Sequence, residues 1–183
     1  NNEHVAVPYK AEKIKTAFAG GYVKEPFVGS HDWVCSFDLN SLYPNILVQW
    51  NMSTETVVDG YVNNISVSKA LDDLIPQVEE QYSLAPSGVR FKKDREGVIP
   101  RIIRQYYEDR VAVKGRMIEA QKEYQKYPTK KLENEIDTLN NHQMAIKILM
   151  NSLYGALGNK YFRYFDQRVA ESVTLTGQLA IQW

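Results

Sequence analysis

Several side chains of this sequence are of the types that bind a phosphorylated ligand. Arg110 and Lys114 are four residues apart, and Lys147, Asn151 and Tyr154 stand at i, i+4 and i+7. On helices, each of these two sets would share one face. Three cations and an amide donor suit a triphosphate, whose charged oxygens require several positive partners and hydrogen-bond donors. The alternative, and the more common case for charges on long helices, is two solvated faces.

Asp38 is a candidate metal ligand. It follows the apolar stretch Trp33–Phe37, which is expected to be a strand, and precedes a turn. A carboxylate there could hold a divalent cation at the rim of a sheet, because Mg²⁺ prefers oxygen ligands and bridges phosphates. The backbone N–H groups of the turn Leu39–Tyr43 could also bind a phosphate. The alternative interpretation is an ordinary aspartate that caps a helix.

Two long helices are expected to position the cations. Apolar residues recur at helical spacing over 100–127 and again over 132–153, and Thr129 is a plausible N-cap for the second helix. Because the break between the helices is short, they should fold back as an antiparallel pair. Arg110 would then lie level with about position 146, so that the cations of both helices could converge on one groove.

Shorter elements complete the expected mixed α/β fold, although residues 52–87 show no clear pattern. We expect strands at Trp33–Phe37 and Tyr161–Phe165, a hairpin of Val89–Phe91 with Val98–Ile99, and helices through Pro44–Trp50 and at Gln167–Trp183. Cys35, the only cysteine, would be a buried apolar residue of the first strand. A single cysteine excludes an internal disulfide framework.

The charge and hydropathy of the chain limit its partners. The 183 residues carry 22 basic and 22 acidic side chains, so no overall basic field indicates nucleic acid. Residues 1–100 nevertheless have a net charge of −4 and residues 101–183 one of +4, so that a polyanion should prefer the second half. Without a long apolar run or a signal peptide, we expect a soluble cytoplasmic protein and no membrane partner. The missing initial Met suggests a piece of something longer.

Two segments resemble motifs of the family B DNA polymerases. Ser36–Pro44 resembles motif A, with its Asp-x-x-Ser-Leu-Tyr-Pro core, and Lys147–Gly155 resembles motif B, Lys-x-x-x-Asn-Ser-x-Tyr-Gly. The flanks Val7–Phe18, Gly21–Pro26 and Ala156–Tyr164 are similar to the replicative polymerases of T-even bacteriophages. The resemblance covers nearly the whole chain. It is thinnest across 55–85 and near position 128, where the fingers are expected to be shorter than in that phage group.

The resemblance implies a role for each residue of motif A. Asp38 would bind both catalytic Mg²⁺ ions, with the carbonyl of Leu39 as an additional ligand. The backbone N–H groups of Ser41, Leu42 and Tyr43 would face the triphosphate of the incoming dNTP. Tyr43 would also be the steric gate, whose ring excludes a ribose 2′-hydroxyl.

The resemblance implies two further groups of residues around motif B. Lys147, expected to be catalytic together with Asp38, would contact the incoming dNTP beside Asn151. Arg110 and Lys114 match the cations of the opposing fingers helix. The residues that would line the pocket of the nascent base pair are Ile148, Ser152, Tyr154 and Gly155. With a DNA primer–template bound, such a site performs nucleotidyl transfer by two-metal catalysis.

The implied architecture is a partial polymerase. Residues 1–99 would form the N-terminal part of an α/β palm, 100–157 a helical-hairpin fingers insertion, and 158–183 the return to an incomplete palm. Motif C, the Tyr-x-Asp-Thr-Asp hairpin with the second metal-binding aspartate, is absent from the sequence, and Phe18–Gly21 replaces a common Tyr-x-Gly-Gly. We therefore expect the chain to be inactive alone.

Three hypotheses remain open at this point. The chain is a fragment that acts with the rest of its polymerase chain, or one subunit of a split polymerase, or a non-catalytic nucleotide- or nucleic-acid-binding module derived from a polymerase. The presence of Asp38 beside the cationic residues favours an enzyme, because a module that only binds does not need a metal-binding carboxylate.

Overall fold

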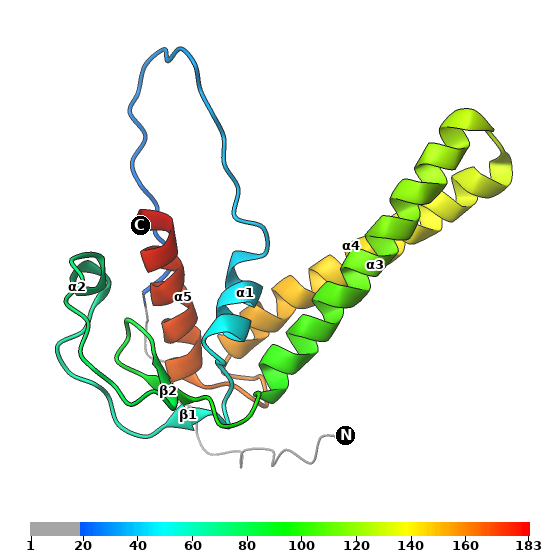
Figure 1. Ribbon diagram of the computed structural model, residues 1–183. Helices are drawn as coiled ribbons and strands as arrows, with labels where there is room; N and C mark the ends of the chain where they lie inside the picture. Colours follow the sequence, from blue (N-terminus) through cyan, green and yellow to red (C-terminus); the bar gives the residue numbers. More distant parts are fainter. Residues whose placement is uncertain (1–18) are drawn as a thin grey trace.

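The described part of the chain folds mainly into helices, with one small sheet at the base of a long helical hairpin (Figure 1). The computed structural model describes residues 19–183, so the phage-like flank Val7–Phe18 lies outside the described residues. The elements in chain order are α1 (Leu42–Gln49), β1 (Val57–Val58), α2 (Val67–Leu71), β2 (Tyr82–Leu84), β3 (Arg90–Lys92), α3 (Val98–Lys126), α4 (Lys130–Leu157) and α5 (Gln167–Gln182).

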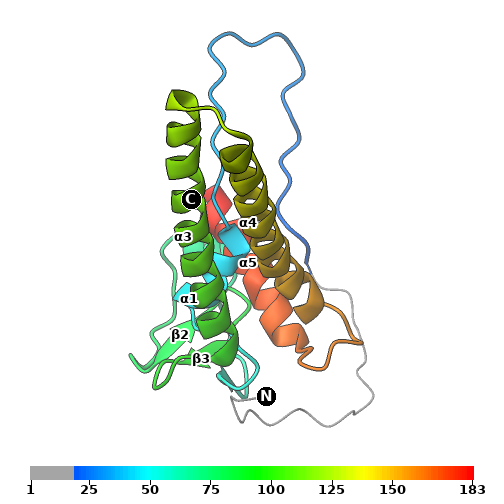
Figure 2. The same ribbon diagram turned by 90° about the vertical axis from the view of Figure 1, so that its right-hand side faces the viewer.

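Helices α3 and α4 pack side by side as an antiparallel pair (Figure 2), which projects from the rest of the described chain (Figure 1). The predicted helical pair is confirmed, including the cap of its second member. The hydroxyl of Thr129 accepts a hydrogen bond from the backbone N–H of Leu132 at 3.3 Å. The apolar residues whose spacing predicts the pair are buried where the two helices pack together, among them Val113, Leu139 and Ile146.

In the described part of the chain, a hydrophobic core joins the base of the hairpin to α1, α5 and the sheet. The sheet has the order β1-β3-β2, and both pairings are antiparallel. Phe91 in the central strand is fully buried and lies opposite both Val57 and Ser83. The sheet therefore presents one side of β3 to the core, while Lys92 next to Phe91 is exposed.

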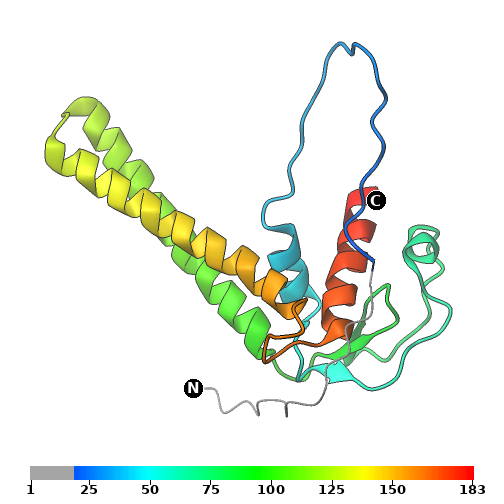
Figure 3. The ribbon, with the colours of Figure 1, turned by 180° about the vertical axis from the view of Figure 1, so that it is seen from behind.

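Helix α5 lies beside α1 and α2, as Figure 3 shows from behind. Its N-cap is Asp166, whose carboxylate accepts from the backbone N–H of Arg168 at 2.9 Å. Small and polar residues are buried along it, among them Ser172 and Gly177, which allows neighbouring elements to approach closely. The predicted helix Gln167–Trp183 is confirmed, as is the predicted helix after Asp38, which forms α1.

The predicted strand Trp33–Phe37 is wrong. Residues 19–40 form an exposed arm without regular structure (Figure 3), in which Trp33 is 99% and Phe37 93% exposed. A strand is stable only when a neighbour satisfies its backbone groups, and none of the three strands of the sheet pairs with this arm. Cys35 is accordingly exposed rather than buried.

Two further strand predictions are also wrong. Val98–Ile99 does not return as a hairpin strand but forms the first turn of α3, where Pro100 is tolerated because the N–H it lacks would have no partner. Strand β3 pairs instead with β2 and β1. The segment Tyr161–Phe165 forms turns, with local bonds such as Phe165 N–H to the Phe162 carbonyl at 3.1 Å. Apolar content alone does not distinguish a strand from such packed turns.

No helix in the described part of the chain, residues 19–183, combines the length and the apolar character needed to span a bilayer.

Candidate functional site

The motif A turn leads from the exposed arm into α1. Asp38 and Leu39 lie at the end of the arm and are both exposed. Ser41, the N-cap residue, has the left-handed backbone conformation φ 54°, ψ 43°, which is uncommon for a residue with a side chain and typical of functional turns. Among the described residues, no side chain caps this helix. The N–H groups of Leu42 and Tyr43, in the first turn of α1, therefore have neither an intrahelical partner nor a side-chain cap.

Tyr43 is the point at which the two sequence motifs meet. Its ring stacks on that of Tyr154 from α4, with ring centroids 4.5 Å apart and an angle of 23° between the planes. On α5, a Cβ at Gly177 would lie 2.8 Å from the Tyr43 ring, so only glycine fits there. A Cβ at Gly21 in the arm would lie 3.2 Å from the Tyr43 hydroxyl oxygen. Three separate parts of the chain, α4, α5 and the arm, thus surround this ring.

The stack also affects the protonation of Tyr154. Burial raises the pKa of Tyr154 to about 12, and the adjacent Tyr43 adds to the rise. Because desolvation penalises the charged form of a phenol, Tyr154 stays neutral at physiological pH and keeps its O–H as a hydrogen-bond donor.

Lys147 and Asn151 extend from the Tyr154 side of α4. The three residues stand at i, i+4 and i+7, so they share a face. Tyr154 is half-buried against α1, while Lys147 and Asn151 are exposed. The face of α4 that packs against motif A through Tyr154 therefore also carries, further along the helix, an exposed cation and an exposed amide donor.

Arg110 fixes the register between the two long helices. Its Nε donates to the side-chain Oε1 of Gln143 at 3.4 Å, and Gln143 lies four residues, about one helical turn, before Lys147. The register expected from the sequence, with Arg110 level with about position 146, is thus correct to within one turn. Lys114 lies one turn further along α3, toward the tip of the hairpin, and is exposed.

The remaining motif B residues lie on another side of α4. Ile148, Ser152 and Gly155 also stand at i, i+4 and i+7, and all three are exposed, Ile148 at 61%. A Cβ at Gly155 would meet nothing within 4 Å. These three residues lie one position, about 100°, around α4 from Lys147, Asn151 and Tyr154, and their face is open to solvent.

The donors for a metal ion at motif A are the carboxylate of Asp38 and the carbonyl of Leu39. Both are hard oxygen donors of the kind that Mg²⁺ takes, and Mg²⁺ usually combines one or two carboxylates with waters and phosphate oxygens. The chemistry therefore fits one such ion. Within residues 19–183 there is no group of three or more His, Cys, Asp or Glu side chains that could hold a metal.

Two residues of this site escaped the sequence analysis. Gln143 is buried, accepts from Arg110 and donates to the side-chain oxygen of Asn140 at 3.0 Å. Its position four residues before Lys147, on the same face, was an available signal. Gly177 touches Tyr43, and nothing local in the sequence indicates this contact, because it depends on how α5 packs.

Comparisons of the sequence relate this chain to known proteins. The profile of DNA polymerase family B matches residues 1–183. The DNA-directed DNA polymerase of Enterobacteria phage T4 is 33% identical over 222 aligned positions, which cover 99% of this chain and 25% of the phage protein. That of Escherichia phage RB69 is 33% identical over 91% of this chain and 23% of its own length. DNA polymerase 1 of Pyrococcus abyssi is 36% identical over 91% of this chain and 18% of its own length.

The chain therefore belongs to DNA polymerase family B. It spans about a quarter, or less, of the length of these relatives.

Proposed function

We propose that this chain forms the nucleotide-binding part of a template-directed DNA polymerase. The motif A turn and the α3–α4 hairpin would hold an incoming dNTP against a primer–template, for transfer of its nucleotidyl group to the primer 3′-hydroxyl. The observation that carries the proposal is the stack of Tyr43 on Tyr154, because it brings the N-terminus of α1 and the cationic face of α4 to one place.

Each group of residues has a proposed task. The N–H groups of Ser41, Leu42 and Tyr43 would bind the triphosphate at the positive end of α1. Lys147 and Asn151 would contact the same phosphates from α4. Cations so placed neutralise charge that develops in the transition state, where positioning and electrostatics account for most of the catalysis.

Arg110 and Lys114 would add positive charge from α3. The bond from Arg110 to Gln143 directs that arginine toward the turn of α4 that precedes Lys147. Ile148, Ser152 and Gly155 would face the nascent base pair together with Tyr154. Their exposure leaves room for a base pair, which is larger than any single side chain.

Asp38 and the Leu39 carbonyl would hold Mg²⁺, which supplies charge neutralisation and activation of the primer hydroxyl when bound. The 183 residues contain no Tyr-x-Asp-Thr-Asp segment for a second aspartate. We therefore propose that these residues bind nucleotide but do not extend a primer by themselves. A second polypeptide stretch, from the same chain or from a complementary subunit, would complete the centre.

The proposed organisation follows the family. Residues 1–99 and 158–183 would belong to the palm and 100–157 to the fingers, with α3 and α4 as the fingers hairpin. The partners would be primer–template DNA and dNTP, and the site of action the cytoplasm, that of the host if the source is viral.

The choice between deoxyribose and ribose tests the proposal. The Tyr43 ring is held by Tyr154 and Gly177, so it cannot move aside for a 2′-hydroxyl. Isothermal titration of the chain with dATP and with ATP, both in Mg²⁺, should show tighter binding of dATP. Tyr43→Ala should reduce that preference, while Tyr161→Ala, at an exposed tyrosine, should leave it unchanged. Equal affinity for both nucleotides in the unaltered chain would contradict the proposed site.

A further inference from the structure

The N-terminus of α3 is held in an unusual way. The first N–H groups of a helix have no intrahelical partner, and the side chain of the N-cap residue commonly accepts from one of them. The N-cap of α3 is Gly97, which has no side chain to serve. The N–H groups of residues 97–99 are satisfied instead by a distant turn, residues 51–56, which follows α1 almost directly.

Three side chains of this turn act as acceptors, each for a different N–H group. The bonds run from Gly97 N to Asn51 Oδ1 at 2.7 Å, from Val98 N to Glu55 Oε1 at 2.6 Å and from Ile99 N to Ser53 Oγ at 3.5 Å. The negative charge of Glu55 is also favourable at the positive end of a 29-residue helix. The acceptors form a cap that comes from another part of the chain.

The turn that carries this cap is internally braced. Thr56 Oγ1 donates to the carbonyl of Asn51 at 2.6 Å and accepts from the N–H of Ser53 at 3.0 Å. The hydroxyl of Ser53 donates to Glu55 Oε2 at 2.5 Å. Two of the acceptors are therefore linked to each other, and the turn holds them in a fixed relation.

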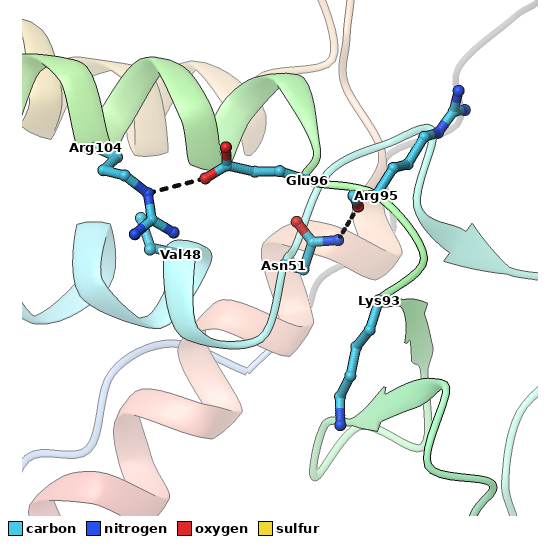
Figure 4. A pocket seen from close by; sticks show the side chains of 6 residues that line it. All are labelled: Val48, Asn51, Lys93, Arg95, Glu96 and Arg104. Atoms are coloured by element: carbon cyan, nitrogen blue, oxygen red, sulfur yellow. Dashed lines mark hydrogen bonds and ion pairs between the residues drawn. The ribbon is translucent and has the colours of Figure 1, made fainter.

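Asn51 also ties down the loop that leads into α3. Its Nδ2 donates to the carbonyls of Lys92 at 2.6 Å and Arg95 at 2.8 Å, and Figure 4 shows the second of these bonds. The same figure shows Arg104 of α3 paired with Glu96 of the loop, at 2.9 Å. An open pocket of about 290 Å³ lies among these residues and is lined mainly by polar and charged side chains. It adjoins the contact between the turn 51–56 and the start of α3, which we call the joint.

The joint is tight where the turn and the helix meet. A Cβ at Gly97 would lie 2.8 Å from the Cβ of Ser53 and 3.2 Å from Cγ2 of Thr56. The turn and the start of α3 are thus in direct contact. A change in the turn should therefore change the direction in which α3 leaves it.

The length of the hairpin magnifies any change at this joint. Arg110 lies 12 residues beyond Val98, which is roughly 18 Å at the rise of an α-helix. A tilt of a few degrees at the joint would therefore move Arg110 and Lys114 measurably relative to α1. The cap follows α1, the helix that carries Tyr43, so it links the two halves of the proposed site.

We propose that Asn51, Ser53 and Glu55 are positioning residues that set the tilt of the α3–α4 hairpin against α1. They thereby determine how far Arg110 and Lys114 stand from the motif A turn. The consequence for nucleotide binding rests on the function proposed above. The tilt itself can be measured without any nucleotide.

Pulsed electron paramagnetic resonance between two spin labels measures this tilt. In a Cys35→Ser background, one label goes on α1 and the other on α3, at the exposed residues Gln49 and Glu119, by the substitutions Gln49→Cys and Glu119→Cys. Glu55→Ala should broaden and shift the distance distribution. Glu55→Gln keeps an oxygen that accepts from the Val98 N–H, so it should preserve the narrow distribution.

Thr129→Ala is the matched control, because it removes a helix cap at the far end of the hairpin and leaves the joint intact. It should not broaden the distribution. A distribution in Glu55→Ala that matches the unaltered chain, with circular dichroism unchanged, would overturn the proposal. If Glu55→Ala does not fold, Ser53→Ala takes its place. An unchanged distribution in that milder variant would overturn the proposal equally.

Nucleotide titration separates this proposal from the function on which its consequence rests. Glu55→Ala should weaken dATP binding several-fold, because the altered tilt displaces Arg110 and Lys114 from the motif A turn, and Glu55→Gln should restore it. Lys147→Ala should weaken dATP binding without broadening the distribution of distances between the labels. Lys147→Ala could leave dATP binding unchanged while Glu55→Ala still broadens the distance distribution. That result would contradict the proposed nucleotide site and support the positioning role of Glu55.

Discussion

The ring of Tyr43 in the first turn of α1 lies stacked on the ring of Tyr154 near the end of α4, with centroids 4.5 Å apart. Each tyrosine belongs to a different polymerase motif, and both pack against the common core. An offset aromatic stack of this kind contributes about 0.5–1.5 kcal/mol beyond the area it buries. It orients the start of α1 toward the face of α4 that carries Lys147 and Asn151.

Gly177 is predicted to be required for this stack. In Gly177→Ala the new methyl group would lie 2.8 Å from Cε1 of Tyr43 and 3.7 Å from Cδ1 of Ile46. Overpacking of this kind should lower the free energy of unfolding by about 1–3 kcal/mol. Urea denaturation followed by circular dichroism measures the change.

Gly115→Ala is the control for that substitution. Gly115 also lies inside a long helix, but a methyl group added there would have no neighbour within 4 Å. Alanine at this position should raise the free energy of unfolding by about 0.5–1 kcal/mol, because glycine is the poorer helix former. If both alanine variants were stabilised alike, the close approach of α5 to Tyr43 would be disproved.

The titration of Tyr154 should make stability depend on alkaline pH. The pKa of Tyr154 is raised to about 12 in the folded chain, from an ordinary 10.0, so the folded state holds this proton more tightly than the unfolded state. The free energy of unfolding should therefore fall as pH rises from about 10 to about 12. Because the ring is only half-buried, the loss should be on the order of 1 kcal/mol.

Tyr154→Phe isolates that contribution, because phenylalanine keeps the ring and cannot ionise. Urea denaturation at a series of pH values should show a smaller loss for this variant between about pH 10 and 12. Parallel pH curves for the two proteins would mean that the burial of Tyr154 does not affect its ionisation.

Asp38 should make nucleotide binding depend on Mg²⁺. Asp38→Asn removes the carboxylate charge while it keeps the size of the side chain, so titration of the dATP-bound chain with Mg²⁺ should show affinity lowered roughly tenfold or more. Asp32→Asn changes an exposed carboxylate of the same arm and should have little effect. Equal losses in both variants would indicate general attraction between the arm and the cation, and no ligand role for Asp38.

Elements with strong local signals could be predicted from the sequence. The spacing of Val113 and Ile146 along two uninterrupted helices, together with the Thr129 cap, determines the hairpin and its register almost completely. The bond between Arg110 and Gln143 then follows within one turn of the expected position. Local propensity and tertiary packing agree in these segments, which makes them predictable.

Segments that depend on distant partners could not be predicted. Trp33–Phe37 has the composition of a strand, but a strand forms only where another strand accepts its hydrogen bonds, and no strand of the sheet does so here. The cap of α3 by Asn51 and Glu55, and the contact of Gly177 with Tyr43, join parts of the chain that are far apart in sequence. No window of local sequence contains both partners of these contacts.

The most direct test of the proposed site is the affinity of the chain for dATP in Mg²⁺, measured by isothermal titration for the unaltered protein and for Arg110→Ala and Lys147→Ala. Each cation is proposed to contact the triphosphate, and a charged hydrogen bond contributes about 1.5–3 kcal/mol. Each variant should therefore bind roughly tenfold more weakly or worse, while Lys131→Ala, an exposed lysine near the hairpin tip, should bind as the unaltered chain does. Unchanged affinity in both Arg110→Ala and Lys147→Ala would contradict the proposal that motifs A and B form one nucleotide site.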